Sequence, residues 1–282
     1  IGLAATAAQQ IVPFAADLAA PERRGAILGT ISSGAIAGVV LSRTLSGFMG
    51  GQFGWRSMFW LAVPLALAGA LLMAAMLPRR RPAASLGYFR LMASLGDLWR
   101  AHPALRLATA TQSLVFAAFM AFWTTMALRL QEPAIGLGAQ AAGSFGLIAI
   151  VGVVTVPVIG RFVDRRGPFP AIIAGTTLTM AGWIVMGAWG TLGGLILGTA
   201  LLDGASRSAL IANQIVVFAQ DAGARSRLNT IFIGSMFLGG AGGSAIAMFT
   251  YTTGGWSAVV VLGAGLAALA TVLQLALRQR MS

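Results

Sequence analysis

Long apolar runs separated by short polar segments dominate the chain. A run of about 20 apolar residues is long enough to cross the hydrocarbon core of a membrane as a helix. The pattern predicts eight such helices, at residues 26–49, 57–77, 107–128, 141–160, 170–189, 193–219, 230–250 and 256–277. A shorter apolar stretch at residues 1–16 is interpreted as the end of a further helix. We therefore expect an all-α membrane protein.

Arginines mark every second connection between these runs. The 19 residues of the Lys and Arg class are all arginines, and 15 of them lie in such connections. They are Arg23, Arg24, Arg79, Arg80, Arg81, Arg90, Arg100, Arg106, Arg161, Arg165, Arg166, Arg225, Arg227, Arg278 and Arg280. Basic residues favour cytoplasmic loops, so we expect a multi-pass protein of the inner (cytoplasmic) cell membrane with its C-terminus in the cytoplasm. This bias also explains the net charge of +12, and we expect no nucleic-acid partner.

The longest polar segment, residues 78–106, divides the apolar runs into two groups. We interpret it as a cytoplasmic linker between a first group in residues 1–77 and a second in residues 107–282. Its apolar residues Phe89, Met92, Leu95 and Leu98 recur at helical spacing. This spacing predicts either an amphipathic helix at the membrane surface or a solvated connector.

Composition restricts the chemistry. The chain has 57% hydrophobic and only 9% charged residues, whereas soluble domains carry about 25% charged residues. It has no Cys and a single His, His102, which excludes disulfides, thiolate metal sites and multi-His metal sites. The sequence contains no HExxH, G-x-S-x-G or phosphate-binding loop. We expect no enzymatic activity, no metal and no cofactor.

Two segments of the chain resemble each other. Residues 9–20 and 213–224 align without gaps and are identical at seven of twelve positions. The aligned pairs include Asp17 with Asp221, Arg23 with Arg227 and, after a short gap, Gly54 with Gly255 and Trp55 with Trp256. The glycine-rich helix that holds Gly34 and Gly38 lies opposite the one that holds Gly239 and Gly243. Both copies run in the same direction, which is typical of transporters built from parallel repeats. By this symmetry we expect three helices and part of a fourth before residue 1, and twelve helices in a protein of about 380 residues.

Two loop motifs accompany this repeat. One is Gly160-Arg161-Phe162-Val163-Asp164-Arg165-Arg166-Gly167, and the other is Pro21-Glu22-Arg23-Arg24-Gly25. With these motifs the sequence resembles the major facilitator superfamily over its whole length. The first is similar to the family's G-x-x-x-D-R-x-G loop, and the second to its charged loop after the fourth helix. The resemblance implies two pseudo-symmetric six-helix bundles, with the end of helix 4 and helices 5 and 6 in residues 1–77 and helices 7–12 in residues 107–282.

The resemblance also implies gating roles for these loops. In the family, the loop aspartate is thought to bind the positive N-terminal end of a neighbouring helix. The gating candidates are Gly160, Asp164, Arg165, Gly167, Asp17, Arg23, Asp221 and Arg227. We expect ion pairs between Asp17 and Arg23 and between Asp221 and Arg227. Alternatively, the arginines serve only membrane topology, and Pro168 and Phe169 stand where the family usually has basic residues.

Charged side chains inside the predicted spans are candidates for a substrate path, since each costs about 2.5–3.5 kcal/mol at a span centre. Asp203, Arg207 and Gln214 fall on one face of the predicted helix at 193–219. The resemblance makes this the tenth helix, which lines the cavity, so we expect Asp203 to carry a proton and Arg207 to hold an anionic substrate group. A structural ion pair is the alternative. Arg43 is a further candidate, unless it reaches the outer interface.

A second candidate wall lies on the predicted helix at 107–128. Gln112, Phe116, Phe119 and Trp123 share one of its faces, which the resemblance makes part of the cavity, and packing or lipid contact is the alternative. Gln10, aligned with Gln214, is a weaker candidate. The glycines Gly34, Gly38, Gly47 and Gly51 are similar to the glycine-rich helix of proton-coupled drug exporters, although the Gly-Pro pair usual there is absent. Ordinary small-residue packing is the alternative.

These features together predict a secondary active transporter. We expect it to move a small organic solute by alternating access, with the proton as coupling ion and efflux as the direction. We expect the protein to act as a monomer in the lipid bilayer. Uptake of an organic anion or sugar is one alternative, and a non-transporting truncated membrane protein is another.

Overall fold

The computed structural model describes residues 24–78, 87–138, 141, 145–148, 163, 165–221 and 223–278. The chain divides into two compact units. The first unit comprises residues 1–82 and 139–147, and the second comprises residues 83–138 and 148–282. The regular structure of the described residues is helical. The expected all-α class is therefore confirmed.

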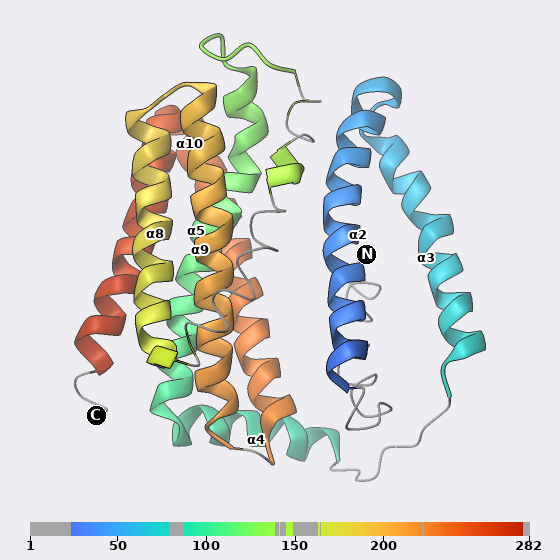
Figure 1. Cartoon of the computed structure of the whole chain (residues 1–282), viewed down its shortest axis with the longest axis vertical. Helices are drawn as coiled ribbons and strands as arrows, with labels where there is room; N and C mark the ends of the chain where they lie inside the picture. The colour runs from blue at the N-terminus through green and yellow to red at the C-terminus, as the bar shows by residue number, and fades with distance from the viewer. Residues whose placement is uncertain are drawn as a thin grey trace. The chain divides into compact units, whose positions relative to one another are not determined.

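The helices follow the predicted apolar runs (Figure 1). The first unit contains α2 (Arg24–Phe53) and α3 (Arg56–Met76), and the second contains α4 (Tyr88–Ala101), α5 (Pro103–Gln131), α8 (Pro168–Ala188), α9 (Leu192–Phe218) and α10 (Arg225–Arg278). The predicted span at 141–160 lies mostly outside the described residues, and Phe145–Ile148 within it form a short 3-10 helix. Among the described residues, five helices are long and apolar enough to cross a membrane.

Helix α10 contains the two spans that the sequence predicts at 230–250 and 256–277. It breaks at Gly255, where φ is 64° and ψ is −163°, a conformation that glycine adopts far more readily than other residues. The second part of α10 returns toward the end of the bundle where α10 begins (Figure 1). Gly54, between α2 and α3, also has a positive φ of 80°. The two Gly-Trp pairs aligned by the repeat therefore both form helix breaks.

Helices α5 and α10 approach each other closely along a line of small residues, here called the α5–α10 seam. A Cβ added to Gly239 would lie 2.7 Å from the carbonyl oxygen of Ser113, and one added to Gly243 would lie 2.4 Å from that of Ala117. Each helix thus presents two small residues four positions apart. This small-xxx-small spacing lets backbones meet in membranes, where apolar burial drives association little.

Helices α8 and α9 meet along a second glycine seam. A Cβ added to Gly175 would lie 2.9 Å from Ala205 and Ala209, and one added to Gly182 would lie 2.9 Å from the carbonyl oxygen of Gly198. By contrast, a Cβ at Gly34 or Gly38 of α2 would meet no described atom within 4 Å. The close contacts of Gly239 and Gly243 are therefore not repeated, among the described residues, at Gly34 and Gly38 of the glycine-rich helix that the repeat sets opposite them.

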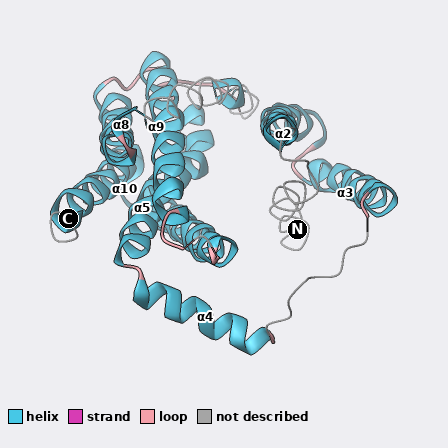
Figure 2. Ribbon diagram, turned by 60° about the horizontal axis from the view of Figure 1, so that its bottom comes forward, coloured by secondary structure: helices cyan, strands magenta, loops and turns pink. Residues whose placement is uncertain are grey.

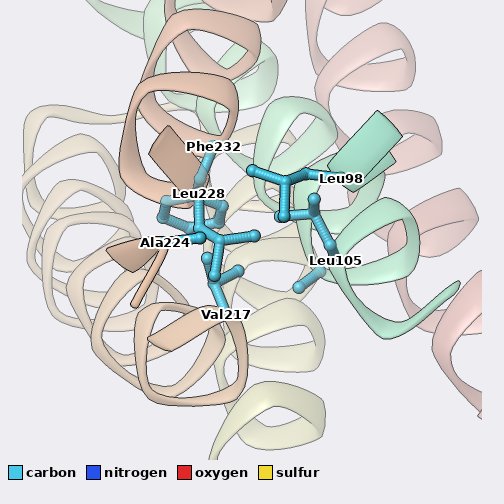
Figure 3. Close-up of a cluster of buried hydrophobic side chains, with 7 residues drawn as sticks. Leu98, Leu105, Val217, Ala224, Leu228 and Phe232 are labelled. Atoms are coloured by element: carbon cyan, nitrogen blue, oxygen red, sulfur yellow. The ribbon is translucent and has the colours of Figure 1, made fainter. Parts of the chain in front are cut away.

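Helix α4 lies across the end of the bundle where α5 begins (Figure 1), and the turned view in Figure 2 shows it lengthwise. Its Leu98 is buried in an apolar cluster with Leu105 of α5, Val217 of α9 and Leu228 and Phe232 of α10 (Figure 3). The amphipathic helix predicted in the polar segment is therefore present, and one of its residues is buried against the bundle.

Helix α5 starts earlier than the apolar pattern predicts. It begins at Pro103 rather than near residue 107, so its first turn includes Arg106. Proline is favoured in the first turn of a helix, where its missing N–H leaves no hydrogen bond unmade. The polar segment therefore ends in a sharp elbow at His102, which separates α4 from α5.

We expect Gly243→Ala to destabilise the second unit and Gly242→Ala not to. Alanine forms helix better than glycine by about 1 kcal/mol, but at Gly243 its methyl group would meet the backbone of Ala117, and overpacking typically costs about 1–3 kcal/mol. At Gly242 the added Cβ meets no described atom within 4 Å. The melting temperatures of both variants in detergent measure the effect. An equal decrease for the two variants would contradict the close contact of Gly243 with Ala117.

Candidate functional site

The charged pair predicted on the span at 193–219 is formed in α9. The Nε atom of Arg207 donates a hydrogen bond of 3.1 Å to Oδ2 of Asp203. The side chain of Asp203 is 1% exposed, whereas that of Arg207 is 30% exposed. The carboxylate is therefore held inside the bundle, and the guanidinium that neutralises it reaches the surface of the second unit.

Gln214, the third residue of the predicted stripe, has a different partner. Its Nε2 atom donates to Oδ1 of Asn229 on α10 at 3.2 Å. The neighbouring Asn213, which sequence reasoning missed, is fully buried, and its Nδ2 atom donates to Oε1 of Gln112 on α5 at 3.3 Å. The polar stripe of α9 therefore consists of a charged pair and, two turns further on, amide side chains that bind neighbouring helices.

A cavity of about 350 Å³ lies near these amides, at the end of the bundle where α5 and α8 begin. Its polar lining comes from Asn213, from Gln274 of α10 and from Arg166 before α8. Gln274 is itself buried, and its Nε2 atom donates to the hydroxyl of Thr111 at 3.0 Å. Gln112 and Gln214 were predicted because each shares a helix face with other candidate residues, whereas Asn213 and Gln274 share a face with none of the candidates and were therefore missed.

The aromatic residues predicted on one face of α5 form a continuous series. Phe116 stacks on Phe119 with their ring centroids 5.9 Å apart, and Phe119 lies 6.1 Å from Trp123. Phe237 of α10 adds an edge-on contact to Phe116 at 5.6 Å. Phe119 is buried, whereas Phe116 and Trp123 are half-buried and retain accessible surface. The face is thus an aromatic wall shared by α5 and α10.

The gating candidates are only partly described. Gly160, Asp164, Asp17, Arg23 and Gln10 lie outside the described residues, as does the side chain of Arg43 on α2. Arg165 is exposed, and Gly167 has a φ of 77° and donates its N–H to the carbonyl of Val163. Gly167 thus makes the turn that starts α8. Ion pairing of Asp17 with Arg23 remains a prediction.

Asp221 occupies a capping position in this conformation. Its Oδ1 atom accepts hydrogen bonds from the backbone N–H groups of Gly223 and Ala224, at 2.8 and 3.2 Å. These residues immediately precede α10, and Arg227 lies half-buried in the first turn of that helix. The carboxylate therefore orders the α9–α10 turn, and its pairing with Arg227 in another conformation remains a prediction.

A polar cluster at the opposite end of the bundle was not predicted. Arg129 at the end of α5 forms an ion pair with Glu132 and donates to the carbonyl of Gly190 at 2.9 Å. The hydroxyl of Tyr251 donates to Glu132 at 2.6 Å, and the guanidinium of Arg129 lies 5.7 Å from the ring of Trp256. We call Arg129, Glu132, Gly190, Tyr251 and Trp256 the outer cluster, because they lie at the end of the bundle away from the arginine-rich loops. The outer cluster joins α5, the α8–α9 turn and the break in α10. Arg129 and Glu132 are three residues apart, but Gly190 and Tyr251 are 61 and 119 positions from their partners, so no local motif reveals the cluster.

Metal binding has no support within the described ranges, which contain no group of three or more His, Cys, Asp or Glu side chains suited to an ion. The second unit contains instead a buried carboxylate with a partly exposed guanidinium, an aromatic wall and three amide contacts between helices; the cavity of about 350 Å³ is lined by Asn213 and Gln274 and not by Asp203 or the aromatic wall. Such groups can hold a small organic molecule by charge, stacking and hydrogen bonds.

Comparison with known proteins gives consistent similarities. Residues 1–221 match the Major Facilitator Superfamily. The chain is 34% identical over 268 residues to the uncharacterized transporter YgaY of Escherichia coli O157:H7, covering 94% of this chain and 68% of that protein. It is 32% identical over 265 residues to the probable transporter SCO4007 of Streptomyces coelicolor, covering 92% of this chain and 60% of that protein.

A solved structure shares the fold. The crystal structure of the Major Facilitator Superfamily transporter FucP in the outward conformation superposes with a TM-score of 0.56 at 17% sequence identity. The match covers 92% of this chain and 58% of the FucP chain. At this identity the likeness concerns the arrangement of helices alone.

The Gln112–Asn213 hydrogen bond should appear as a coupling energy between α5 and α9. In a double-mutant cycle with Gln112→Leu and Asn213→Leu, we expect a coupling of about 0.6 kcal/mol and at most about 1.7 kcal/mol, the range for such bonds in membranes. Unfolding by SDS in mixed micelles measures it. The control pair is Gln112→Leu with Ser208→Ala, because among the described residues the Ser208 hydroxyl bonds within α9, to the carbonyl of Gly204. A coupling no larger than that of the control would contradict the contact.

In the outer cluster, Glu132→Gln should destabilise the protein more than Tyr251→Phe. Glu132 accepts from both Arg129 and Tyr251, and hydrogen bonds to charged groups are worth about 1.5–3 kcal/mol, against about 0.5–1.5 kcal/mol for a typical bond. Tyr251→Phe leaves the Arg129 ion pair in place. Detergent melting curves rank the two variants, and the reverse order would show that the tyrosine rather than the ion pair holds the cluster.

Proposed function

The chain belongs to the Major Facilitator Superfamily, and on that basis we propose that the protein is a secondary active transporter that moves a small organic solute across the membrane by alternating access. Two bacterial relatives at 32–34% identity are named as transporters. We further propose proton-coupled efflux as its direction. The protein would act as a monomer in the inner membrane, with the arginine-rich end of its helices in the cytoplasm.

The Asp203–Arg207 pair is the observation that carries this proposal. A charged pair within a spanning helix is costly, so its presence favours a role in binding or coupling over packing. Asp203 is almost fully buried, and Arg207 is its hydrogen-bonded neighbour one turn away. A proton that binds Asp203 would remove the negative charge that holds Arg207. Proton binding and solute binding would thereby compete for the same carboxylate.

The aromatic wall supports an aromatic or amphipathic solute. Phe116 and Trp123 are half-buried on α5, and Phe237 on α10 is 51% exposed. Aromatic faces attract organic cations as well as apolar rings. A solute stacked on this wall with a cationic group at Asp203 would be a substrate for export in exchange for protons.

Uptake of an organic anion is the second candidate, and the exposure of Arg207 favours it. At 30% exposure the guanidinium is far more accessible than the carboxylate it neutralises, and its planar group binds carboxylates and phosphates well. Uptake of a sugar would rely instead on amide hydrogen bonds such as those of Gln112 and Gln214. A non-transporting truncated membrane protein is the remaining alternative.

The loop residues contribute to gating in this proposal. Gly167 makes the turn before α8 and Asp221 caps the turn before α10, so both stand at the arginine-rich ends of helices. We propose that Arg165 and Arg227 exchange partners with nearby carboxylates, Asp164 and Asp221 among them, as the protein changes conformation. The residues Gly160, Asp17 and Arg23 would serve the same purpose.

The proposal is tested by thermal stabilisation of the purified protein with tetraphenylphosphonium, benzoate and glucose. A ligand at 100 times its dissociation constant adds about 2.7 kcal/mol to the native state. We expect stabilisation by the cation that is lost in Asp203→Asn and retained in Ser208→Ala, a control in the same helix. Stabilisation by benzoate that is lost in Arg207→Gln would favour organic-anion uptake. If neither variant changes any response, the pair is structural and the site assignment is wrong.

A further inference from the structure

The elbow between α4 and α5 is held by an arginine. The Nη1 atom of Arg106, in the first turn of α5, donates to the carbonyl oxygens of Trp99 and Arg100 at 3.2 and 3.0 Å. These carbonyls belong to the last turn of α4, where a helix lacks hydrogen-bond partners of its own. Arg106 therefore fixes the direction of α4 and brings its guanidinium to the junction of the two helices.

A groove opens beside this junction. It has a volume of about 380 Å³ and is lined by Trp99 of α4, by Pro103, Arg106, Leu107 and Ala110 of α5, and by Leu273 and Leu277 of α10. Arg106 is the charged residue among them, and it lies at the end nearest α4. Leu107 and Ala110 follow along α5, away from the elbow. The groove thus has a cationic end and an apolar length.

The surroundings indicate that lipid rather than water borders this groove. Leu277 and Trp99 on its rim are 39% and 38% exposed, and Phe89 at the start of α4 is 86% exposed. Such exposed apolar residues would be unfavourable in water but are suited to the boundary between acyl chains and headgroups. Arg90 and Arg100 of α4 are also exposed, so the same helix presents positive charge to that boundary.

We propose that an anionic phospholipid binds in this groove. Its phosphate lies at Arg106, with the exposed Arg100 of α4 adding positive charge next to the groove, and one acyl chain runs along Leu107, Ala110 and Leu273. Basic pockets between spanning helices are suited to anionic headgroups, and the apolar length of the groove matches a chain rather than a free phosphate or a soluble peptide. The proposal requires only that the helices span a bilayer, so it stands apart from the direction and substrate of transport.

The test measures lipid retained by the whole purified chain in native mass spectrometry. We expect phosphatidylglycerol to be retained in preference to phosphatidylcholine. Ala110 is exposed, so Ala110→Trp should fill the groove without disturbing the bundle and should abolish this preference. Ala110→Ser is its matched control. Melting temperatures close to that of the unaltered protein confirm that each variant is folded.

A variant that removes one positive charge tests whether the phosphate binds at the arginine end of the groove. Arg100→Gln leaves the backbone carbonyl that accepts from Arg106 in place, and we expect it to weaken phosphatidylglycerol retention about fivefold, the effect of one arginine at an anionic lipid surface. Arg225→Gln should leave retention unchanged, because Arg225 is an exposed arginine at the start of α10 whose Nε atom donates to the carbonyl of Phe218, whereas Arg100 adjoins Arg106 through its own carbonyl.

Three outcomes would overturn the proposal. The first is equal retention of the two lipids, and the second is undiminished phosphatidylglycerol binding in Ala110→Trp. The third is displacement of the lipid by an equal concentration of glycerol phosphate, because a soluble headgroup should not replace a ligand held largely by its acyl chain.

Discussion

Close contact between helix backbones is the interaction on which the second unit depends. In a bilayer, apolar side chains gain little by leaving lipid for protein, so helices associate through dispersion contacts and hydrogen bonds that need short distances. Gly239 and Gly243 provide such distances against α5, and Gly182 and Gly198 provide them between α8 and α9. Gln112 on α5 bonds Asn213 on α9 within the bundle that these contacts hold together. The site is therefore built on positions that carry no functional group.

The two Gly-Trp breaks show what the internal repeat preserves. In each, a glycine with positive φ is followed by a tryptophan that has an arginine near its ring, Arg56 at 4.3 Å from Trp55 and Arg129 at 5.7 Å from Trp256. The arginines come from different places, one adjacent in sequence and one from another helix. What is common is thus a cation beside an aromatic ring at a helix break. The repeat thus preserves the glycine and the tryptophan, while the arginine comes from a different position in each copy.

The sequence predicted the helices well because a spanning helix is defined by local composition. Apolar length, arginine placement and the Gly-Trp pairs located the described spans and the break at Gly255. It predicted the Asp203–Arg207 pair because the two residues lie one turn apart. It could not predict the contacts of Asn213 or the outer cluster around Glu132, because these join residues about 60 to 120 positions apart. The sequence also placed the start of α5 too late, because the charge of Arg106 suggested a linker residue although Arg106 belongs to the first turn of the helix.

The elbow at His102, which Arg106 holds, couples the orientation of α4 to that of the helices in the second unit. Helix α4 is joined to α5 by two hydrogen bonds from Arg106 and is anchored in the bundle by buried Leu98. A force that tilts α4 is therefore passed to α5 as a torque and, through the α5–α10 seam, to α10. If α4 lies at a membrane surface, the lateral pressure and the thickness of the bilayer would act directly on the orientation of α4. The mechanical state of the lipid would then bias the conformation of the bundle without any ligand being bound.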